Sequence, residues 1–242
     1  MKFFHIFENV KTLYLFKMKA LESLRLKLHN KAELSGQEKE TNKILNSFIE
    51  KTNPDIHLRK IGGYGILVVF KGKSEGKNIL LRADIDGLNI PMDNCQQTTV
   101  NRQFSHRCGH DGHAAILCGL AKAYSKERPE RGNVILLFQA AEETGEGAQA
   151  ILDDPLFKEF RIDVAFALHN LPGYAKHQIV LKKECFASAS QGLKLIFEGK
   201  TSHASQPDKG NNPQQLITTL LDALQKKYES LRRDKYHTIL TV

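Results

Sequence analysis

Three short and almost uninterrupted apolar runs decide what architecture this chain can adopt. They lie at residues 78–82, 133–138 and 163–168, and each has the length and composition of a strand that is buried on both faces. Residues 113–127 and 147–153, which lie between the runs, carry apolar side chains at helical spacing. Strands that alternate with helices predict an α/β fold with a mostly parallel sheet.

The residues before the first run predict two helices and two further strands. Leucines at helical spacing indicate a helix over residues 20–29. Ser35, followed three residues later by Glu38, has the form of a capping box, which predicts the start of a second helix that ends at Asn53-Pro54. The segments with strand character are residues 56–61 and 65–70.

The last part of the chain predicts a second domain, which is entered near residues 187–190. Segments 178–182 and 192–197 have the patterns of strands, and a further strand begins at Tyr236. A long helix begins after Asn211-Asn212-Pro213 and continues to about residue 232. The stripe of large apolar side chains along this helix predicts packing into a core.

Charge and composition narrow the classes of partner. The net charge is +8, but the lysines are scattered and no basic run is interleaved with aromatic residues, so we expect no nucleic-acid partner. Residues 1–20 make a poor signal peptide, and no other segment approaches transmembrane length. The cysteines form no C-x-x-C pair and favour a reducing compartment, so we expect a cytoplasmic protein without membrane contact. They are Cys95, Cys108, Cys118 and Cys185.

Residues 106–113 gather one thiol, three imidazoles and one carboxylate in the sequence His-Arg-Cys-Gly-His-Asp-Gly-His. Thiolate and imidazole suit borderline metals such as Zn²⁺, and imidazole with carboxylate suits Mn²⁺ and its neighbours. A histidine-rich surface loop without a ligand is the alternative interpretation. The motif on its own favours a divalent-metal site.

Polar side chains that can bind metals also follow each of the three apolar runs. In chain order they are Asp84 and Asp86, Glu142 and Glu143, and His169. Sites in open α/β sheets form beyond the carboxyl ends of the strands, where these side chains would meet. Taken singly, they could be turn formers, a charge pair at a helix N-terminus and a strand-end histidine. Their joint position favours a single site together with the motif at residues 106–113.

Six segments resemble, in family order, those of the M20 metallopeptidase and amidohydrolase family, in its branch of N-acyl-amino-acid, hippurate and auxin-conjugate amidohydrolases. They read LHNKAELSGQEKET, LLRADIDGLNI, HRCGHDGHAAILCGLA, GNVILLFQAAEETGEGAQAIL, FALHNLPG and FEGKTSHASQPDKGNNP. The resemblance implies a catalytic domain of the di-metal exopeptidase type, with a mostly parallel sheet, and a smaller α+β lid or dimerisation domain. We therefore expect an N-terminal extension (1–18), a catalytic domain (19–186) and an incomplete smaller domain (187–242).

The resemblance also implies a set of metal ligands for two divalent ions, with Zn, Mn, Ni and Co as the candidates. The matching positions are Cys108, His110, Glu143 and His169. Glu142 takes the place of the family's general base.

Three further positions match residues that act around these ligands. Asp86 matches the family's site-orienting carboxylate, and Asp84 lies beside it in the sequence. His203, in the second domain, matches a histidine that polarises the substrate carbonyl, often across a dimer interface. The resemblance therefore implies a possible homodimer through the second domain.

The chain departs from the family pattern in several places. Asp86-Gly87-Leu88-Asn89 stands for the usual Asp-Ala-Leu-Pro, Thr201-Ser202 for a Gly-Gly pair, and Asp208 for a histidine. The family's catalytic domain resumes after the smaller domain and supplies a last histidine ligand. The resemblance therefore implies a C-terminally truncated chain that lacks this ligand.

The expected chemistry is hydrolysis of an amide bond by metal-activated water. Two ions can lower the pKa of a bridging water towards neutrality, to about 7 at a zinc centre. Glu142 would accept the proton and deliver it to the leaving amine. We expect N-acyl amino acids or similar small conjugates as substrates, with a small-peptide hydrolase or an inactive truncated product as alternatives. A cysteine-protease interpretation of Cys108 would leave the other polar residues unexplained.

Overall fold

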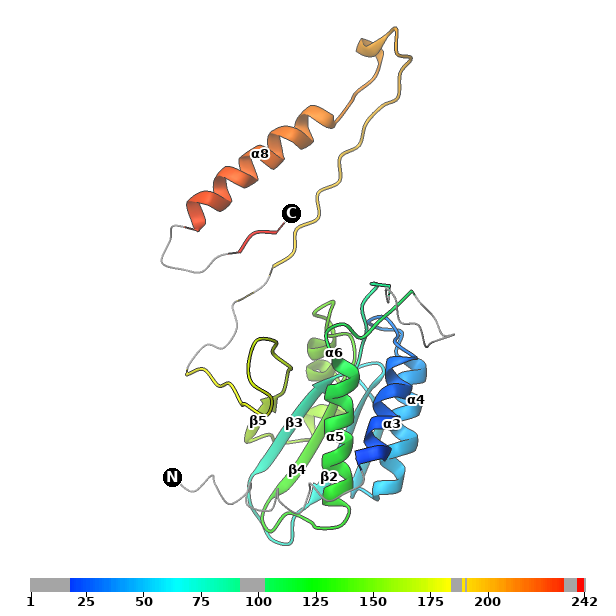
Figure 1. The fold of residues 1–242 in the computed structure, drawn as a ribbon, viewed down its shortest axis with the longest axis vertical. Helices are drawn as coiled ribbons and strands as arrows, with labels where there is room; N and C mark the ends of the chain where they lie inside the picture. Colours follow the sequence, from blue (N-terminus) through cyan, green and yellow to red (C-terminus); the bar gives the residue numbers. More distant parts are fainter. Residues whose placement is uncertain (1–17, 92–102, 184–188, 190, 233–238, 242) are drawn as a thin grey trace. The chain divides into compact units, whose positions relative to one another are not determined.

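The structure is a computed structural model that describes residues 18–91, 103–183, 189, 191–232 and 239–241 (Figure 1). It contains two compact units, residues 1–176 and 177–242. The second unit thus begins before residue 187, where the sequence predicted the smaller domain to begin. The predicted limits of the three parts stay a prediction.

The first unit is built on a five-stranded sheet with the strand order β1-β2-β4-β3-β5. The strands are β1 (Ile56–Ile61), β2 (Gly65–Lys71), β3 (Asn78–Asp84), β4 (Asn133–Gln139) and β5 (Val164–Ala167). β3 pairs in parallel with β4 and β5, which confirms the α/β class and the parallel relation of the three apolar runs. β2 pairs antiparallel with β1 and β4. The sheet is therefore mixed. The connection between β1 and β2 is short, and a short connection can only join antiparallel strands.

Helices cover both faces of this sheet (Figure 1). α3 (Met18–His29), α4 (Lys39–Ile49) and α5 (His110–Tyr124) pack on one face, and α6 (Gly147–Asp153) and α7 (Pro155–Lys158) pack on the other. A short 3-10 helix, Glu50–Thr52, follows α4. Alternate side chains of each central strand enter the two cores, so a strand with both faces covered must be apolar throughout. This explains the uninterrupted apolar runs of the sequence.

The start of α4 differs from the predicted capping box. Glu38 occupies the N-cap position, but no side-chain hydrogen bond caps the helix there. The carboxylate of Glu33 instead accepts hydrogen bonds from two backbone N–H groups at the start of α4, at 3.1 and 2.8 Å. The capping-box prediction is wrong because Ser35 and Glu38 direct their side chains to partners outside this helix.

α5 begins at His110, whereas the apolar spacing predicted a start at His113. Gly109 precedes the helix with φ +91°, a left-handed conformation that glycine adopts without steric strain. This sharp entry places the second half of the histidine-rich motif, residues 110–113, in the first turn of α5.

The second unit contains α8 (Gln214–Leu231) and the 3-10 helix Pro207–Lys209. No strand forms at residues 178–182 or 192–197 in the described part of this unit, so both strand predictions are wrong. A strand requires a neighbour that takes its backbone hydrogen bonds, and only the isolated bridge Lys200↔Asn211 is present among these residues. The apolar stripe of α8 is not buried, contrary to the predicted core packing. The strand predicted from Tyr236 begins outside the described residues.

Among the described residues, no helix combines the length and the apolar character that crossing a membrane requires. Cys108 and Cys118 are free thiols. Cys95 and Cys185 lie outside the described residues, so the predicted compartment stays a prediction.

We expect Leu136→Ala to lower the free energy of unfolding by about 2–5 kcal/mol, because Leu136 is fully buried and its truncation leaves a cavity in the core between the sheet and α3, α4 and α5. Leu26→Ala is the control, since that side chain is 55% exposed; its effect should stay within roughly 0.5 kcal/mol. Urea unfolding followed by circular dichroism measures both. Equal effects would contradict the core described above.

Candidate metal centre

Polar side chains from three loops meet at the carboxyl ends of β3, β4 and β5. β3 lies between the other two strands, so the segments that follow the three strands converge over its last residue, Asp84. The first turn of α5 adds further donors. Three overlapping groups of candidate metal ligands result, and within each group the ligand atoms lie within 4.8 Å of one another. The groups are Asp84, His110, His113 and His169; Cys108, His110 and Glu143; and Asp86, His110 and Glu142.

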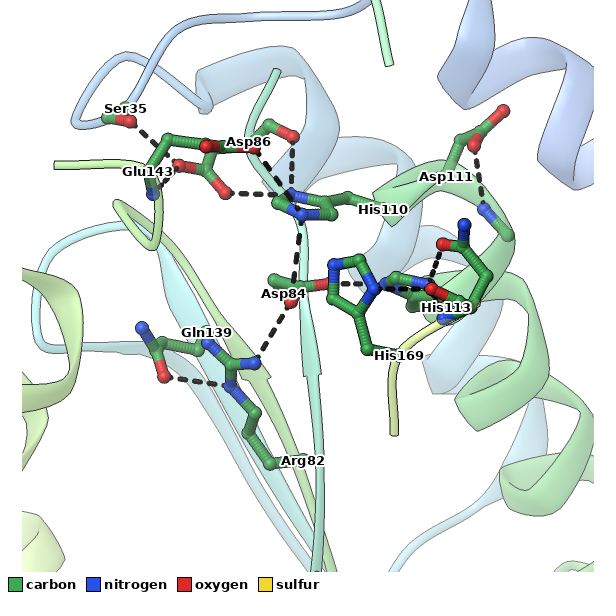
Figure 2. A network of polar contacts seen from close by, with 12 residues as sticks. Ser35, Arg82, Asp84, Asp86, His110, Asp111, His113, Gln139, Glu143 and His169 are labelled. Carbon is green, nitrogen blue, oxygen red and sulfur yellow. Dashed lines mark hydrogen bonds and ion pairs between the residues drawn. The ribbon is translucent and has the colours of Figure 1, made fainter. Parts of the chain in front are cut away.

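His110 belongs to all three groups, and its imidazole is buried. Nδ1 lies 3.0 Å from the backbone oxygen of Asp86 and 3.1 Å from its Oδ1; because both are acceptors, we assign the hydrogen to Nδ1. Nε2 is buried and has no hydrogen-bond partner among the described residues. It faces Oδ2 of Asp84 and Oε1 of Glu143, each at 3.7 Å (Figure 2). Three acceptors that face one another leave a place that a cation fits.

The donors around His110 fit a divalent metal ion. Zn²⁺ lies about 2.0–2.3 Å from nitrogen, oxygen and sulfur ligands, so two ligands of one ion are roughly 3–4 Å apart. Both 3.7 Å separations from Nε2 fall in this range. The hydrogen bond between Nδ1 and Asp86 is also the means by which carboxylates orient metal-binding histidines. The residues present therefore suit a metal, and their donor types suit Zn²⁺, Mn²⁺, Ni²⁺ and Co²⁺ alike.

The protonation of the cluster reflects its carboxylates. Burial works to lower the pKa of His110, but the hydrogen bond to Asp86 and the charges of nearby carboxylates outweigh it and raise the pKa. Burial works to raise the pKa of Asp84, but the hydrogen bond with His113 and nearby positive charges outweigh it and lower the pKa. The cluster thus favours ionised carboxylates and attracts positive charge.

Cys108 is in surroundings that disfavour a thiolate without a metal. Burial, a hydrogen bond with Glu143 and the charges of nearby carboxylates raise the pKa of its thiol to about 12. Reactive cysteines have a lowered thiol pKa, so this geometry does not support a nucleophilic cysteine. A bound divalent cation would favour the thiolate, which agrees with a ligand role.

His113 links the end of β3 to the loop after β5. Its Nδ1 lies 2.6 Å from Oδ1 of Asp84, and its Nε2 lies 3.0 Å from the backbone nitrogen and 2.6 Å from Oδ1 of Asn170 (Figure 2). Both ring nitrogens are thus engaged by the protein, which indicates that His113 positions Asp84 and the loop that carries His169. His113 is not among the ligands or catalytic residues predicted from the sequence. Its place three residues after His110, on the same side of a helix, was the available signal.

Asp86 is the second carboxylate that holds a histidine of α5. Its Oδ2 accepts hydrogen bonds from the Ser35 hydroxyl at 2.7 Å and from the backbone N–H of Glu143 at 2.9 Å (Figure 2). Asp84 and Asp86 are both fully buried, and each orients one of the two histidines. The site contact of Ser35 was missed because its position in the sequence also fits a helix cap.

His110 belongs to all three groups, and the other three predicted metal ligands are divided between two of them. Cys108, His110 and Glu143 lie together in one group. His169 shares a different group with His110, and the centroids of the two rings are 5.8 Å apart. Their roles as ligands stay a prediction that this placement supports.

The two other predicted catalytic residues have different surroundings. Glu142 lies in the third group, where its carboxylate oxygen is within 4.8 Å of the candidate ligand atoms of Asp86 and His110. His203 lies in the second unit, where its Nδ1 is 2.8 Å from the Ser205 hydroxyl. The role predicted for His203 stays a prediction.

Comparison with known proteins gives the family. Residues 80–239 match the sequence profile of peptidase family M20/M25/M40. The chain belongs to this family. The matched region begins in β3 and includes every candidate ligand, which confirms the resemblance seen in the motifs.

Named members of the M20 family are similar to this chain over part of their length. The chain is 32% identical over 207 residues to a hippurate hydrolase of Campylobacter jejuni, covering 84% of the chain and 53% of the relative. It is 34% identical over 209 residues to the N-acetyl-L-cysteine deacetylase of Bacillus subtilis, covering 86% and 50%. A crystal structure of a dinuclear metal-binding M20 peptidase from Bacillus subtilis matches with a TM-score of 0.58 and 32% identity, covering 64% of this chain and 43% of that one. The chain spans about half the length of the curated relatives it matches.

We expect Cys108→Ala to weaken Co²⁺ binding at least about tenfold, because the substitution removes a donor from the group around His110. Cys118→Ala is the matched control. The Cys118 thiol lies on α5 and is buried in the hydrophobic core between that helix and the sheet, so its loss should lower stability and leave metal affinity unchanged. Equilibrium dialysis of both variants against Co²⁺ measures the affinity. Wild-type affinity in Cys108→Ala would rule out this ligand.

Proposed function

We propose that this protein is a metal-dependent amidohydrolase that cleaves the amide bond of N-acyl amino acids or similar small conjugates. The observation that carries the proposal is the buried Nε2 of His110, which has no partner among the described residues and faces two carboxylates. Membership of the M20 family and the names of the two relatives support amide hydrolysis.

The ligands in this proposal come from the loops at the sheet edge and from the first turn of α5. Cys108, His110, Glu143 and His169 would hold a divalent metal, with two ions as in the dinuclear M20 peptidase. When bound, such ions lower the pKa of water and polarise an amide carbonyl. Asp86 and Asp84 keep the histidines of α5 in the orientation that binding requires.

Glu142 is the proposed general base. It is half-buried and follows β4, and an oxygen of its carboxylate lies within 4.8 Å of the candidate ligand atoms of Asp86 and His110. From this position it can accept a proton from the attacking water and deliver it to the amine that leaves. Asp86 is less suited to this role, because both of its carboxylate oxygens already take part in hydrogen bonds within the protein.

The substrate class follows from the relatives. One is named for hippurate and the other for N-acetyl-L-cysteine, and both names describe small acylated amino acids. A panel of N-acetyl and N-benzoyl amino acids against unmodified dipeptides tests the class. Cleavage of the dipeptides alone would favour a small-peptide hydrolase and reject the proposal.

We expect Glu142→Gln to reduce hydrolysis by roughly 10²–10⁴-fold while leaving metal content unchanged, because the amide keeps the shape of the side chain but cannot accept the proton. Glu146→Gln is the control: it makes the same chemical change at an exposed position of the same loop. Turnover and metal content are measured on the same preparations. Substantial turnover in Glu142→Gln would show that another group is the base.

We further propose a homodimer formed through the second unit, with His203 contributing to the partner's site. The support is the match of His203 to the family motif and the apolar stripe of α8, none of whose side chains is buried. Sedimentation velocity on the chain should give the mass of a dimer. A monomer throughout the micromolar range would reject this part of the proposal.

A further inference from the structure

Glu38 is a fully buried carboxylate outside the ligand groups. Its Oε1 accepts hydrogen bonds from the backbone N–H of Gly36 at 2.9 Å and from the backbone N–H of Ala141 at 2.8 Å. Its Oε2 is buried without a partner among the residues that the structure describes. Burying a carboxylate costs free energy, so a role that needs this acceptor is to be expected.

Ala141 is the residue that turns the chain from β4 into the metal centre. Its φ is +49°, a left-handed conformation that is strained for a non-glycine residue. Its N–H is bound by Glu38, and its C=O accepts a hydrogen bond from the N–H of Gly147 at 2.9 Å. Both backbone polar groups of the strained residue are therefore held, and Glu142 and Glu143 follow directly.

We propose that Glu38 is a positioning residue of the metal centre: its buried carboxylate holds Ala141 in the left-handed turn that directs Glu142 and Glu143 to the ligand cluster. The consequence for metal binding rests on the function proposed above. The consequence for the turn itself does not.

A second contact from the same segment supports this role. Ser35 binds Oδ2 of Asp86, and the same oxygen accepts the backbone N–H of Glu143 (Figure 2). The segment before α4 is therefore fastened to the centre at two points, through Asp86 and through Ala141. A segment that only began a helix would need neither contact.

The capping of α4 does not account for Glu38. Glu33 supplies the side-chain oxygens that accept the first N–H groups of that helix. Burial raises the pKa of the Glu38 carboxyl, the hydrogen bonds from the backbone oppose this, and the charge of Asp86 adds to it. A neutral side chain with the same acceptor oxygen should therefore serve in its place, which gives the role a specific signature.

The test compares Glu38→Gln, Glu38→Asp and Glu38→Ala with the control Glu33→Ala. Glu33 lies in the same segment and also accepts backbone N–H groups, but its bonds go to α4. The first measurement is hydrogen exchange, by mass spectrometry, of the metal-free chain in peptides that contain residues 140–147. The second is Co²⁺ affinity together with the visible absorption of the Co²⁺ complex.

We expect Glu38→Ala and Glu38→Asp to speed exchange over residues 140–147 about tenfold or more, because the first lacks the acceptor and the second is too short to reach Ala141. Co²⁺ affinity should fall about 10–100-fold in both, with an altered absorption spectrum. Glu38→Gln should stay within about threefold of wild type in both measurements, because its amide oxygen can accept the same N–H groups. Glu33→Ala should lower stability and leave the turn and the metal site unchanged.

Wild-type exchange over residues 140–147 in Glu38→Asp would overturn the inference, and so would a loss in Glu38→Gln as large as in Glu38→Asp. This pair decides the matter even if Glu38→Ala does not fold. Unchanged Co²⁺ affinity alongside faster exchange would also overturn it, because the turn would then not position the centre. If the wild-type chain binds no Co²⁺, the proposed function fails, and the exchange measurement still decides whether Glu38 holds the turn.

Discussion

The hydrogen bond between Asp86 and Nδ1 of His110 determines how the rest of the centre is arranged. Both side chains are buried, so either partner left alone would carry an unsatisfied polar group. With Nδ1 held, the ring can only present Nε2 to the carboxylates of Asp84 and Glu143. Asp86 is in turn bound by Ser35 and by the backbone of Glu143, so one carboxylate connects four separate parts of the chain.

The electrostatics of the cluster follow from this arrangement. Carboxylates gathered at one edge of a sheet repel one another, and a low local dielectric strengthens the repulsion. Arg82 offsets part of it through an ion pair with Asp84 at 2.9 Å. Around Cys108, the carboxylates of Glu143, Glu142 and Asp84 add to the effect of burial and raise the pKa of the thiol further. Affinity for a divalent cation is therefore a property of the fold as well as of the ligand types.

The sequence predicted those features that follow from a repeating pattern. The three buried runs are apolar because they are parallel strands covered on both faces. Asp84, Glu142 and His169 lie in ligand groups that share His110 because parallel strands end at one edge. Contacts between distant segments were not predictable in this way. Ser35 and Glu38 satisfy the capping-box pattern, yet their partners are Asp86 and Ala141, which no local pattern specifies. In the second unit, strand-like residues form no strand where the described chain offers no neighbour to pair with.

The failed capping box and the strained turn at Ala141 have a common physical basis. A local rule is broken at low cost only where the surrounding structure makes up for it, and such places gather at functional sites. Here the carboxylate that could have capped α4 is buried instead against the one non-glycine residue in β4's exit turn with a positive φ. Glu33 takes over the cap, and α4 begins at Lys39, later than a capping box with Ser35 at the N-cap would place it. Because Glu33 caps α4, the carboxylate of Glu38 can instead hold the backbone from which Glu142 and Glu143 reach the centre.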